Sequence, residues 1–289
     1  MDHGGNREIH TEAVVISIER DWSTDSLMKV MEARMKSRPV LLNPDSVSVA
    51  EGGLVYSGRK IEPELVIVRR LKPSHLQSGL TSSVLRGLEE GCKVINRFQA
   101  IATAANKGES SVILAKRGIP VPRFLVTRDF EEAWRFVREE GKVVQKPLYG
   151  FQGVGLRIIT SEDKDKLIDQ IGSSDPIYLQ SYIEKSGWDG RILVAGKKPV
   201  AAMKRITGND WRTNLARGGR AKPWKPSQKT INIAVQAVDA LGLDYGAVDL
   251  VGDLKLVMEI NGTPGWRGLQ SVAEVNVAER LTEIFLGEG

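Results

Sequence analysis

The sequence of 289 residues contains one cysteine, three histidines and no long apolar run, and each scarcity excludes a kind of site. Cys92 alone can form neither an intrachain disulfide nor a cysteine zinc cluster. No histidine has metal-ligand spacing, and two lie in the first ten residues, which disfavours a Ser–His–Asp site. Apolar runs such as Ala13–Ile18 are far shorter than the roughly 20 residues that cross a bilayer. With no signal-peptide stretch either, we expect a cytoplasmic protein without a membrane partner.

The composition is that of a globular protein of about two domain-sized units. Hydrophobic residues make up 41% and charged residues 27% of the chain, with a net charge of +5 and a pI near 9.2. This balance suits anionic ligands such as a nucleotide, an acidic amino acid or a nucleic acid. The basic residues are scattered except for one concentration at Arg212, Arg217, Arg220, Lys222 and Lys225. Charge alone does not choose among these ligands.

The first 105 or so residues alternate between strand and helix patterns. Strands are expected at Ala13–Ile18, Val40–Leu42 and Leu65–Val68, a small hairpin at Gly52–Lys60, and helices at Ser26–Lys36 and Arg97–Lys107. Buried strands that alternate with helices are typical of an α/β unit.

Two further units follow. The second is expected to hold strands at Phe124–Thr127, Lys142–Pro147 and Leu156–Thr160, with helices at Ser110–Lys116 and after Asp129, which starts a capping box with Glu132. The last has expected strands at Ile177–Ile183, Arg191–Val194, Val200–Ile206, Tyr245–Val251 and Lys255–Ile260, a polar loop at Thr207–Pro226 and a helix at Ser227–Leu241. The glycine-rich stretch Tyr149–Gly155 forms the tip of a hairpin.

Two C-terminal strands carry the sharpest local feature. Glu259 and Asn261 are two residues apart, so their side chains share one face of a strand. Asp249 joins them on that face if the apolar neighbours form the opposite, buried face, namely Val248, Leu250, Leu256, Met258 and Ile260. In an antiparallel pair this sorting requires an odd-length or bulged turn, because a one-residue slip moves every side chain to the other face. Two carboxylates and an amide oxygen suit Mg²⁺ bound together with phosphates, although a solvent-facing polar strand edge is the alternative.

A second feature is Lys146 followed by Gly150, Gly153 and Gly155. Glycines let backbone amides approach phosphates, while the lysine supplies charge. The pattern is neither a P-loop nor a dinucleotide fingerprint, and it joins two strands. By itself it indicates a glycine hairpin more often than a nucleotide cover.

A third feature is the run Trp211–Asn214, which follows Lys204 and Arg205 and leads to Gly218 and Gly219. Arginines beside glycines suit a phosphate or an oxyanion. A basic surface loop explains the same residues equally well.

Taken together and in order, these motifs resemble the ATP-grasp superfamily, and within it the RimK-like glutamate ligases. The similarity covers roughly residues 94–285. It rests on Val94–Asn96, Lys107, Gly118–Pro120, Lys146–Leu148, the glycine loop, Gln180–Ile183, Asp189–Arg191, Ala201–Met203, Trp211–Asn214, Gly218-Gly219, Gly246–Asp249 and Met258–Gly265. The resemblance implies an α/β (α+β) ATP-grasp fold with a Rossmann-like domain before it. The implied division is 1–105 for that first domain, 106–185 for the subdomain with the glycine hairpin, and 186–289 for the subdomain with the metal site.

The resemblance also implies roles for individual residues. ATP would contact Lys107, Lys146, Gly150, Gln152, Gly153, Gly155, Gln180, Ser181, Tyr182, Asp189, Arg212, Thr213 and Asn214. Mg²⁺ or Mn²⁺, as two ions, would bind Asp249, Glu259 and Asn261, and the catalytic set would be Arg191, Arg205, Arg212 and Asn214. The chain departs from its relatives at Asn106, Phe151 and Ser181, where they commonly have Asp, Ser or Thr, and Glu.

The chemistry implied by the resemblance is amide formation through an acylphosphate, with ADP released. The favoured reaction adds L-glutamate to a carboxylate of a cofactor or protein. Alternatives are a lysine-biosynthesis ligase of the same fold and a nucleotide- or nucleic-acid-binding module without activity. Nucleic acid is the less favoured partner, because such a module has no need of a complete metal set. The sequence leaves open the acceptor, the number of residues added, the preference for ATP or GTP, and whether the chain forms a homo-oligomer.

Overall fold

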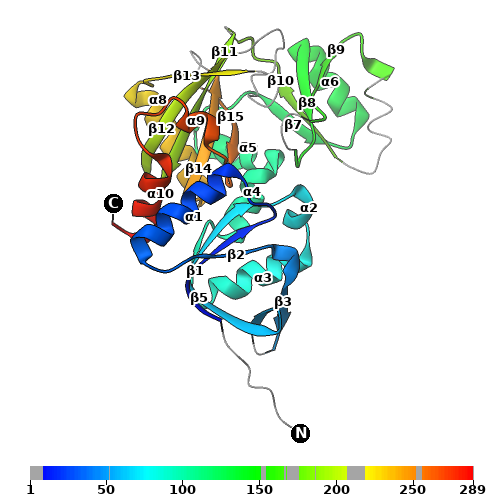
Figure 1. Ribbon diagram of the computed structural model, residues 1–289. Helices are drawn as coiled ribbons and strands as arrows, with labels where there is room; N and C mark the ends of the chain where they lie inside the picture. Colours follow the sequence, from blue (N-terminus) through cyan, green and yellow to red (C-terminus); the bar gives the residue numbers. More distant parts are fainter. Residues whose placement is uncertain are drawn as a thin grey trace.

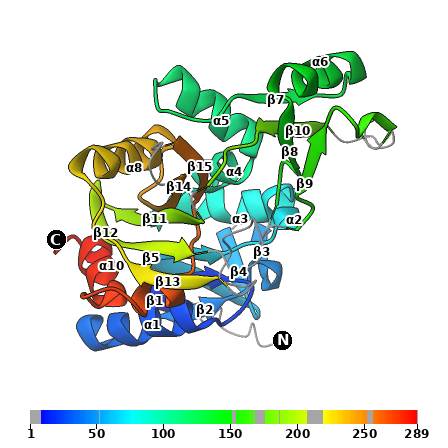
Figure 2. The same ribbon diagram turned by 90° about the horizontal axis from the view of Figure 1, so that it is seen from above.

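Three β-sheets organise the chain in the computed structural model (Figure 1). The structure describes residues 9–51, 53–150, 154–165, 167, 176–185, 187–206, 219–251 and 256–288. Figure 2 shows that the four-stranded sheet and its helix form a lobe apart from the other two sheets. No helix in these ranges is long and apolar enough to cross a membrane.

The first sheet belongs to the N-terminal α/β unit and has the strand order β2-β1-β5-β4-β3, with β6 beside β5. Its strands are β1 (Ile9–Ser17), β2 (Val40–Leu42), β3 (Val47–Ala50), β4 (Gly53–Tyr56), β5 (Arg59–Arg70) and β6 (Lys93–Ile95). Its helices are α1 (Trp22–Met35), α2 (Pro73–Leu76), α3 (Gly79–Glu89) and α4 (Phe98–Ala105), with a 3₁₀ turn at Pro44–Ser46. The β1, β2, β5 and β6 strands run parallel, as expected of an α/β unit.

The expected helix at Arg97–Lys107 is wrong as one element. Asn106 has extended backbone angles, ends α4 and caps α5 (Lys107–Lys116) by accepting from the amides of Gly108 and Glu109. Asparagine is a strong N-cap because its side-chain oxygen satisfies free amides of the first turn. Its amide group also donates to Tyr149 Oη. The residue that departs from the family pattern therefore still begins the helix that carries Lys107.

The four-stranded antiparallel sheet has the order β7-β10-β8-β9. It consists of β7 (Phe124–Thr127), β8 (Lys142–Lys146), β9 (Arg157–Thr160) and β10 (Ile177–Ser181), packed against α6 (Phe130–Glu140). Asp129 caps α6 by accepting from the Glu132 amide, as the sequence predicts, but its own amide donates to Thr127 Oγ1 and not to Glu132, which corrects the expected capping box. The β8 and β9 strands pair antiparallel, so the glycine-rich segment does join a hairpin.

The five-stranded sheet has the order β13-β12-β11-β14-β15. Its strands are β11 (Trp188–Ala195), β12 (Lys198–Ile206), β13 (Arg220–Pro223), β14 (Tyr245–Val251) and β15 (Leu256–Asn261). One face packs on α8 (Gln228–Ala240), and the other packs on a core shared with α1, β1 and the C-terminal helices α9 (Arg267–Gln270) and α10 (Val277–Leu286). The β13 strand corrects the expected polar loop at Thr207–Pro226, because pairing with β12 organises a stretch too polar to signal a strand.

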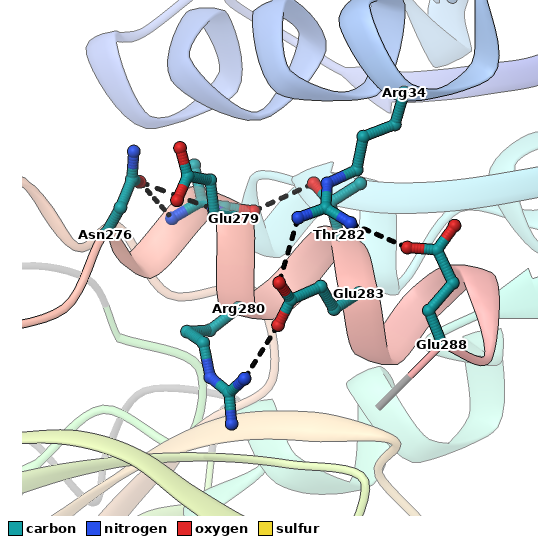
Figure 3. Close-up of polar contacts among 8 residues, drawn as sticks. Arg34, Asn276, Glu279, Arg280, Thr282, Glu283 and Glu288 are labelled. Carbon is teal, nitrogen blue, oxygen red and sulfur yellow. Dashed lines mark hydrogen bonds and ion pairs between the residues drawn. The ribbon is translucent and has the colours of Figure 1, made fainter.

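The first and last helices of the chain lie side by side (Figures 1 and 2). Arg34 on α1 donates to Glu283 at 2.8 Å and to Glu288 at 2.7 Å, and Arg280 also pairs with Glu283 (Figure 3). These partly exposed ion pairs contribute little each. The buried residues beneath them, including Met31 and Leu281, supply the main attachment of the N-terminal unit to the C-terminal helix.

A buried asparagine connects the first sheet to the strand that carries Asp249. Asn96 donates to the carbonyls of Tyr245 and Gly262, both at 2.7 Å, and accepts from the amides of Asp244 and Tyr245. Four backbone groups therefore depend on one side chain. Sequence patterning does not reveal this function, because the four partners lie about 150 residues away along the chain.

Replacing Asn96 with alanine is expected to lower the free energy of unfolding by about 2–4 kcal/mol, because it leaves buried backbone groups unpaired. Urea unfolding measures this change. The control is Asn232→Ala, which removes an exposed asparagine that accepts a hydrogen bond from Gln228 across one turn of α8. Equal effects of the two variants would contradict the connecting role.

Candidate functional site

The site begins with two carboxylates opposed across neighbouring strands. In the β14–β15 register, Asp249 is the direct partner of Glu259, and Asn261 is the partner of Ala247. Direct partners in an antiparallel pair lie on the same face with their Cβ atoms roughly 5 Å apart. The three oxygen-bearing side chains therefore share one face of the sheet edge, as alternation in the sequence predicts.

A β-bulge sets this register. Leu250 pairs with Val257, so Met258 is the extra residue between that pair and the pair formed by Asp249 and Glu259. Val257 is therefore buried in the core, whereas Leu256 and Met258 are only half-buried, which corrects their expected place on the buried face. The turn itself, 252–255, lies outside the described residues. Within the described strands, the bulge supplies the extra residue that the face-sorting required.

Two arginines surround Asp249. Arg191 binds it through Nε at 2.6 Å and Nη2 at 2.8 Å, and Arg205 Nη2 lies 2.9 Å from its Oδ2. Burial raises the pKa of Asp249, but Arg191 and then Arg205 outweigh burial and hold the pKa well below its usual range. Arg205 Nε also donates to Asp189 at 2.6 Å. The result is a buried network of two guanidinium groups and two carboxylates.

Arg205 is the centre of this network, with only 4% of its surface exposed. Burial lowers the pKa of Arg205, but the nearby carboxylates of Asp249 and Asp189 raise it by more than burial lowers it. The guanidinium group therefore stays charged. Replacing Arg205 with methionine is expected to cost about 3–5 kcal/mol of stability, because two buried carboxylates lose a partner. Thermal or urea unfolding tests this, with Lys198→Met at the exposed start of the same strand as control. A cost under about 1 kcal/mol, as for an exposed pair, would contradict the network.

Lys107 brings the helix α5 to the carboxylate pair. It is the first residue of α5, it is buried, and its Nζ lies 3.4 Å from Glu259 Oε1. A Cβ added to Gly150 would lie 3.1 Å from this ammonium group. Glycine at position 150 therefore leaves room for the lysine beside the glycine-rich loop.

Lys146 ends β8 and is buried. Its Nζ donates to Gln180 Oε1 at 2.6 Å, and Gln180 in turn donates to Tyr178 Oη at 3.0 Å. Burial lowers the pKa of Lys146 to about 8, and the positive charges of Lys107 and Lys185 act in the same direction, against Glu259 and Asp249. An anion bound beside Lys146 would therefore strongly stabilise its charged form. Burial also raises the pKa of Tyr178 to about 12, so the phenol stays protonated.

Lys185 is a residue that the sequence did not single out. It lies between β10 and β11, donates to Asp189 Oδ2 at 3.2 Å and contributes to the field at Lys146. The one signal in the sequence was a lysine four residues before Asp189. Such a spacing is too common to indicate a site.

The remaining expected ligands are placed as follows. Ser181 donates to Glu140 and to the Arg123 carbonyl, and the Tyr182 ring lies 3.8 Å from Lys142 Nζ. Gly155 adopts a positive φ of 76°, which favours glycine. The expected contacts of Gln152, Gly153, Arg212, Thr213 and Asn214 lie outside the described residues.

The donors that the site offers to a metal ion are oxygen atoms. Among the described residues, no three His, Cys, Asp or Glu side chains converge. The candidate set is completed only by the amide oxygen of Asn261, and oxygen donors of this kind suit Mg²⁺ bound together with phosphates. Within the described residues, Asp249 Oδ1 accepts one hydrogen bond, from Arg191 Nε, so one of its two lone pairs remains for a cation. The set fits a magnesium ion shared with a phosphate.

Comparison of the whole structure defines the class of protein. The chain superposes on the ATP-grasp ligase PsnB complexed with minimal precursor, with a TM-score of 0.78, 25% identity and coverage of 96% of this chain and 99% of that one. PsnB complexed with minimal precursor, Mg and ADP gives a TM-score of 0.73 at 25% identity, covering 96% and 98%. The fold is that of the ATP-grasp ligases.

Sequence comparison then gives the family. Residues 104–285 match the RimK-like ATP-grasp domain. The tetrahydromethanopterin:alpha-L-glutamate ligase of Methanocaldococcus jannaschii is 32% identical over 284 residues, covering 93% of this chain and 96% of that protein. The ribosomal protein bS6–L-glutamate ligase of Salmonella schwarzengrund is 30% identical over 281 residues, covering 92% and 93%. The chain belongs to the RimK-like ATP-grasp family and is an ATP-dependent ligase.

Proposed function

We propose that this ligase adds L-glutamate to a carboxylate of a protein or cofactor, with ATP as the phosphate donor. The observation that supports an ATP site most strongly is the cluster of two buried lysines beside two opposed carboxylates. Lys107 contacts Glu259, and Lys146 has its pKa lowered to about 8 inside the same charge cluster. The relatives named above transfer L-glutamate to a cofactor and to a ribosomal protein.

In the proposed reaction, an oxygen of the acceptor carboxylate attacks the γ-phosphorus of ATP and the bond to ADP breaks. The glutamate amine then attacks the acyl carbon of the resulting acylphosphate and forms the amide. The bond from that carbon to the phosphate oxygen breaks, and inorganic phosphate leaves with the proton lost by the amine. Lys107 and Lys146 offset the charge that gathers on the transferring phosphate. Two Mg²⁺ ions, held by Asp249, Glu259 and Asn261, would supply further charge and orient the phosphates.

The two arginines have different proposed roles. The Arg191 side chain keeps 20% of its surface exposed, whereas that of Arg205 keeps 5%. We therefore assign Arg191 to the substrate carboxylate or the tetrahedral oxyanion. Arg205 is a positioning residue, because its contacts fix Asp189 and Asp249. Arg212, Thr213 and Asn214 are assigned to the phosphates, and Gln152, Gly153 and Gly155 to the cover over them.

We further propose that the nucleotide base lies at the end of β10, near Gln180, Ser181 and Tyr182, with its ribose toward Asp189. The chain passes from the four-stranded to the five-stranded sheet at this connection, and the base would lie between the two sheets. Residues 1–105, 106–185 and 186–289 are proposed as the N-terminal domain, the hairpin subdomain and the metal-binding subdomain. Enclosure between two sheets would exclude water from the acylphosphate.

The experiment that tests the proposal measures ADP release with ATP, Mg²⁺, L-glutamate and a panel of acceptors. The panel contains tetrahydromethanopterin and ribosomal protein bS6, the acceptors named for the two relatives. A product heavier than the acceptor by one glutamyl unit, seen by mass spectrometry, supports the proposal. ADP release that needs an amino acid other than glutamate would overturn the choice of glutamate and leave the ligase chemistry intact.

A further inference from the structure

The outer edge of the five-stranded sheet carries a second concentration of charge, which the ligase site does not use. Lys204 on β12 and Lys222 on β13 are direct register partners, and Arg220 lies two residues before Lys222. Alternation places these three on one face. That face is the one covered farther along by α8, and it is opposite to the face on which Arg205 meets Asp249.

This arrangement is unfavourable in isolation. Like charges directly opposed across two strands destabilise a sheet, yet Lys222 and Arg220 are exposed and Lys204 is half-buried beside them. The sequence from Gly219 to Val238 contains Arg220, Lys222, Lys225 and Lys229 and no aspartate or glutamate. The sheet therefore concentrates one sign of charge where the neighbouring segment supplies no counter-charge.

Two tryptophan rings pack beside these cations, against each other and against the strand backbone. Lys204 Nζ lies 4.1 Å from the Trp188 ring centroid, and the Trp188 and Trp224 rings meet edge to face at 5.7 Å. A Cβ added to Gly190 would lie 2.3 Å from the Trp224 ring, so this ring rests directly on the backbone of β11. We call Trp188, Lys204, Arg220, Lys222, Trp224 and Lys225 the basic patch.

We propose that the basic patch binds an acidic polypeptide segment, a chain rich in glutamate or aspartate side chains. Its ammonium and guanidinium groups complement carboxylates, and β13 is the outermost strand of the five-stranded sheet, where an extended chain can run alongside. The tryptophan rings already contact Lys204 and the Gly190 backbone, which makes carboxylates a better match than stacked nucleic-acid bases. This binding function goes beyond the proposed ligation and does not depend on which acceptor is modified.

The test titrates the full chain into a fluorescein-labelled oligo-glutamate peptide without ATP and follows fluorescence anisotropy. The binding should weaken with added salt, because it depends on exposed charges. The double variant R220E/K222E should bind about tenfold more weakly or worse. The control K29E/K198E makes the same change in net charge at exposed lysines on α1 and at the far end of β12, and should stay within about twofold of the parent protein.

Three results would overturn the proposal. One is an equal loss in both double variants, which would make net charge the cause. Another is tighter binding of a single-stranded oligonucleotide, with the same loss in R220E/K222E, which would make the patch a nucleic-acid surface. The third is a change of sedimentation coefficient in R220E/K222E alone, which would make it a contact between copies of the chain. Unchanged ATP binding by R220E/K222E confirms that the variant is folded and separates this test from the ligase proposal.

Discussion

Replacing Glu259 with glutamine is expected to lower ATP turnover by about a thousandfold or more while the fold stays intact. The substitution removes one carboxylate from the proposed metal set and leaves a weaker neutral oxygen. Its cost in stability is expected to be under about 1 kcal/mol, because 45% of the side chain is exposed and its ion pair with Lys107 is long at 3.4 Å. ADP release at increasing Mg²⁺ measures the first effect and thermal unfolding the second.

Glu259 tests the metal set more cleanly than Asp249. An asparagine at Asp249 would also break the buried pairs with Arg191 and Arg205, so lost activity would be mixed with lost stability. The matched control is Glu274→Gln, an exposed carboxylate between α9 and α10. A second readout is Mn²⁺ binding followed by electron paramagnetic resonance in the presence of a nucleotide. Full turnover of E259Q at saturating Mg²⁺, or unchanged Mn²⁺ binding, would remove Glu259 from the proposed metal set.

Replacing Lys146 with methionine is expected to stabilise the protein at pH 7 while weakening nucleotide binding about a hundredfold. The pKa of Lys146 falls from 10.5 to about 8 because of burial, so the charged form is unfavourable in the folded state. Below pH 8 the lysine is charged in both states, and the penalty, roughly 3 kcal/mol, is fully present. Between pH 8 and 10.5 the unfolded chain holds more protons than the folded one, so stability rises with pH.

The difference in unfolding free energy between K146M and the parent protein should therefore shrink as the pH rises from 8 toward 10.5. Urea unfolding at several pH values measures it, and other titrating groups cancel in the difference. The control is Lys142→Met, which removes an exposed lysine from the start of the same strand. A gap independent of pH would show that Lys146 keeps an ordinary pKa in the folded protein.

The same pKa predicts that nucleotide binding takes up a proton near pH 8. Phosphates beside Lys146 favour its charged form, so its pKa rises when ATP binds. Calorimetry in two buffers of different ionisation enthalpy measures the uptake, which K146M should lose. Equal uptake in the two proteins would assign the proton to another group.

Local patterns were sufficient for the elements with clear periodicity. The β7 and β14 strands occupy the expected ranges Phe124–Thr127 and Tyr245–Val251, and Asp129 caps α6 as expected. The helix α3 was not expected, because its first turns combine Gly79 with Thr81, Ser82 and Ser83, which are poor helix formers. The buried faces of Val84, Leu85 and Leu88 stabilise it by packing on the first sheet. Here tertiary burial outweighs local propensity.

For the candidate site too, the sequence predicted one part of the arrangement and the tertiary structure decided the other. The spacing of Glu259 and Asn261, and the alternation around Asp249, were enough to place the three on one face, because a strand has a period of two residues. The position of the bulge could not be predicted from the sequence. Whether Val257 or Met258 is the buried residue depends on which one fits the core under α8.

The sequence by itself determined the identity of this protein as an ATP-grasp ligase, since the ordered motifs from Asn96 to Gly265 reflect a chemistry that needs particular residue types. Only the tertiary structure showed that Arg191 and Arg205 hold Asp249, that Lys107 reaches Glu259, and that Lys146 is enclosed. Charges that lie from 44 residues (Arg205 and Asp249) to 152 residues (Lys107 and Glu259) apart along the chain meet through sheet pairing and helix packing. Their field and burial, which set the pKa of Lys146, exist only once the chain is folded.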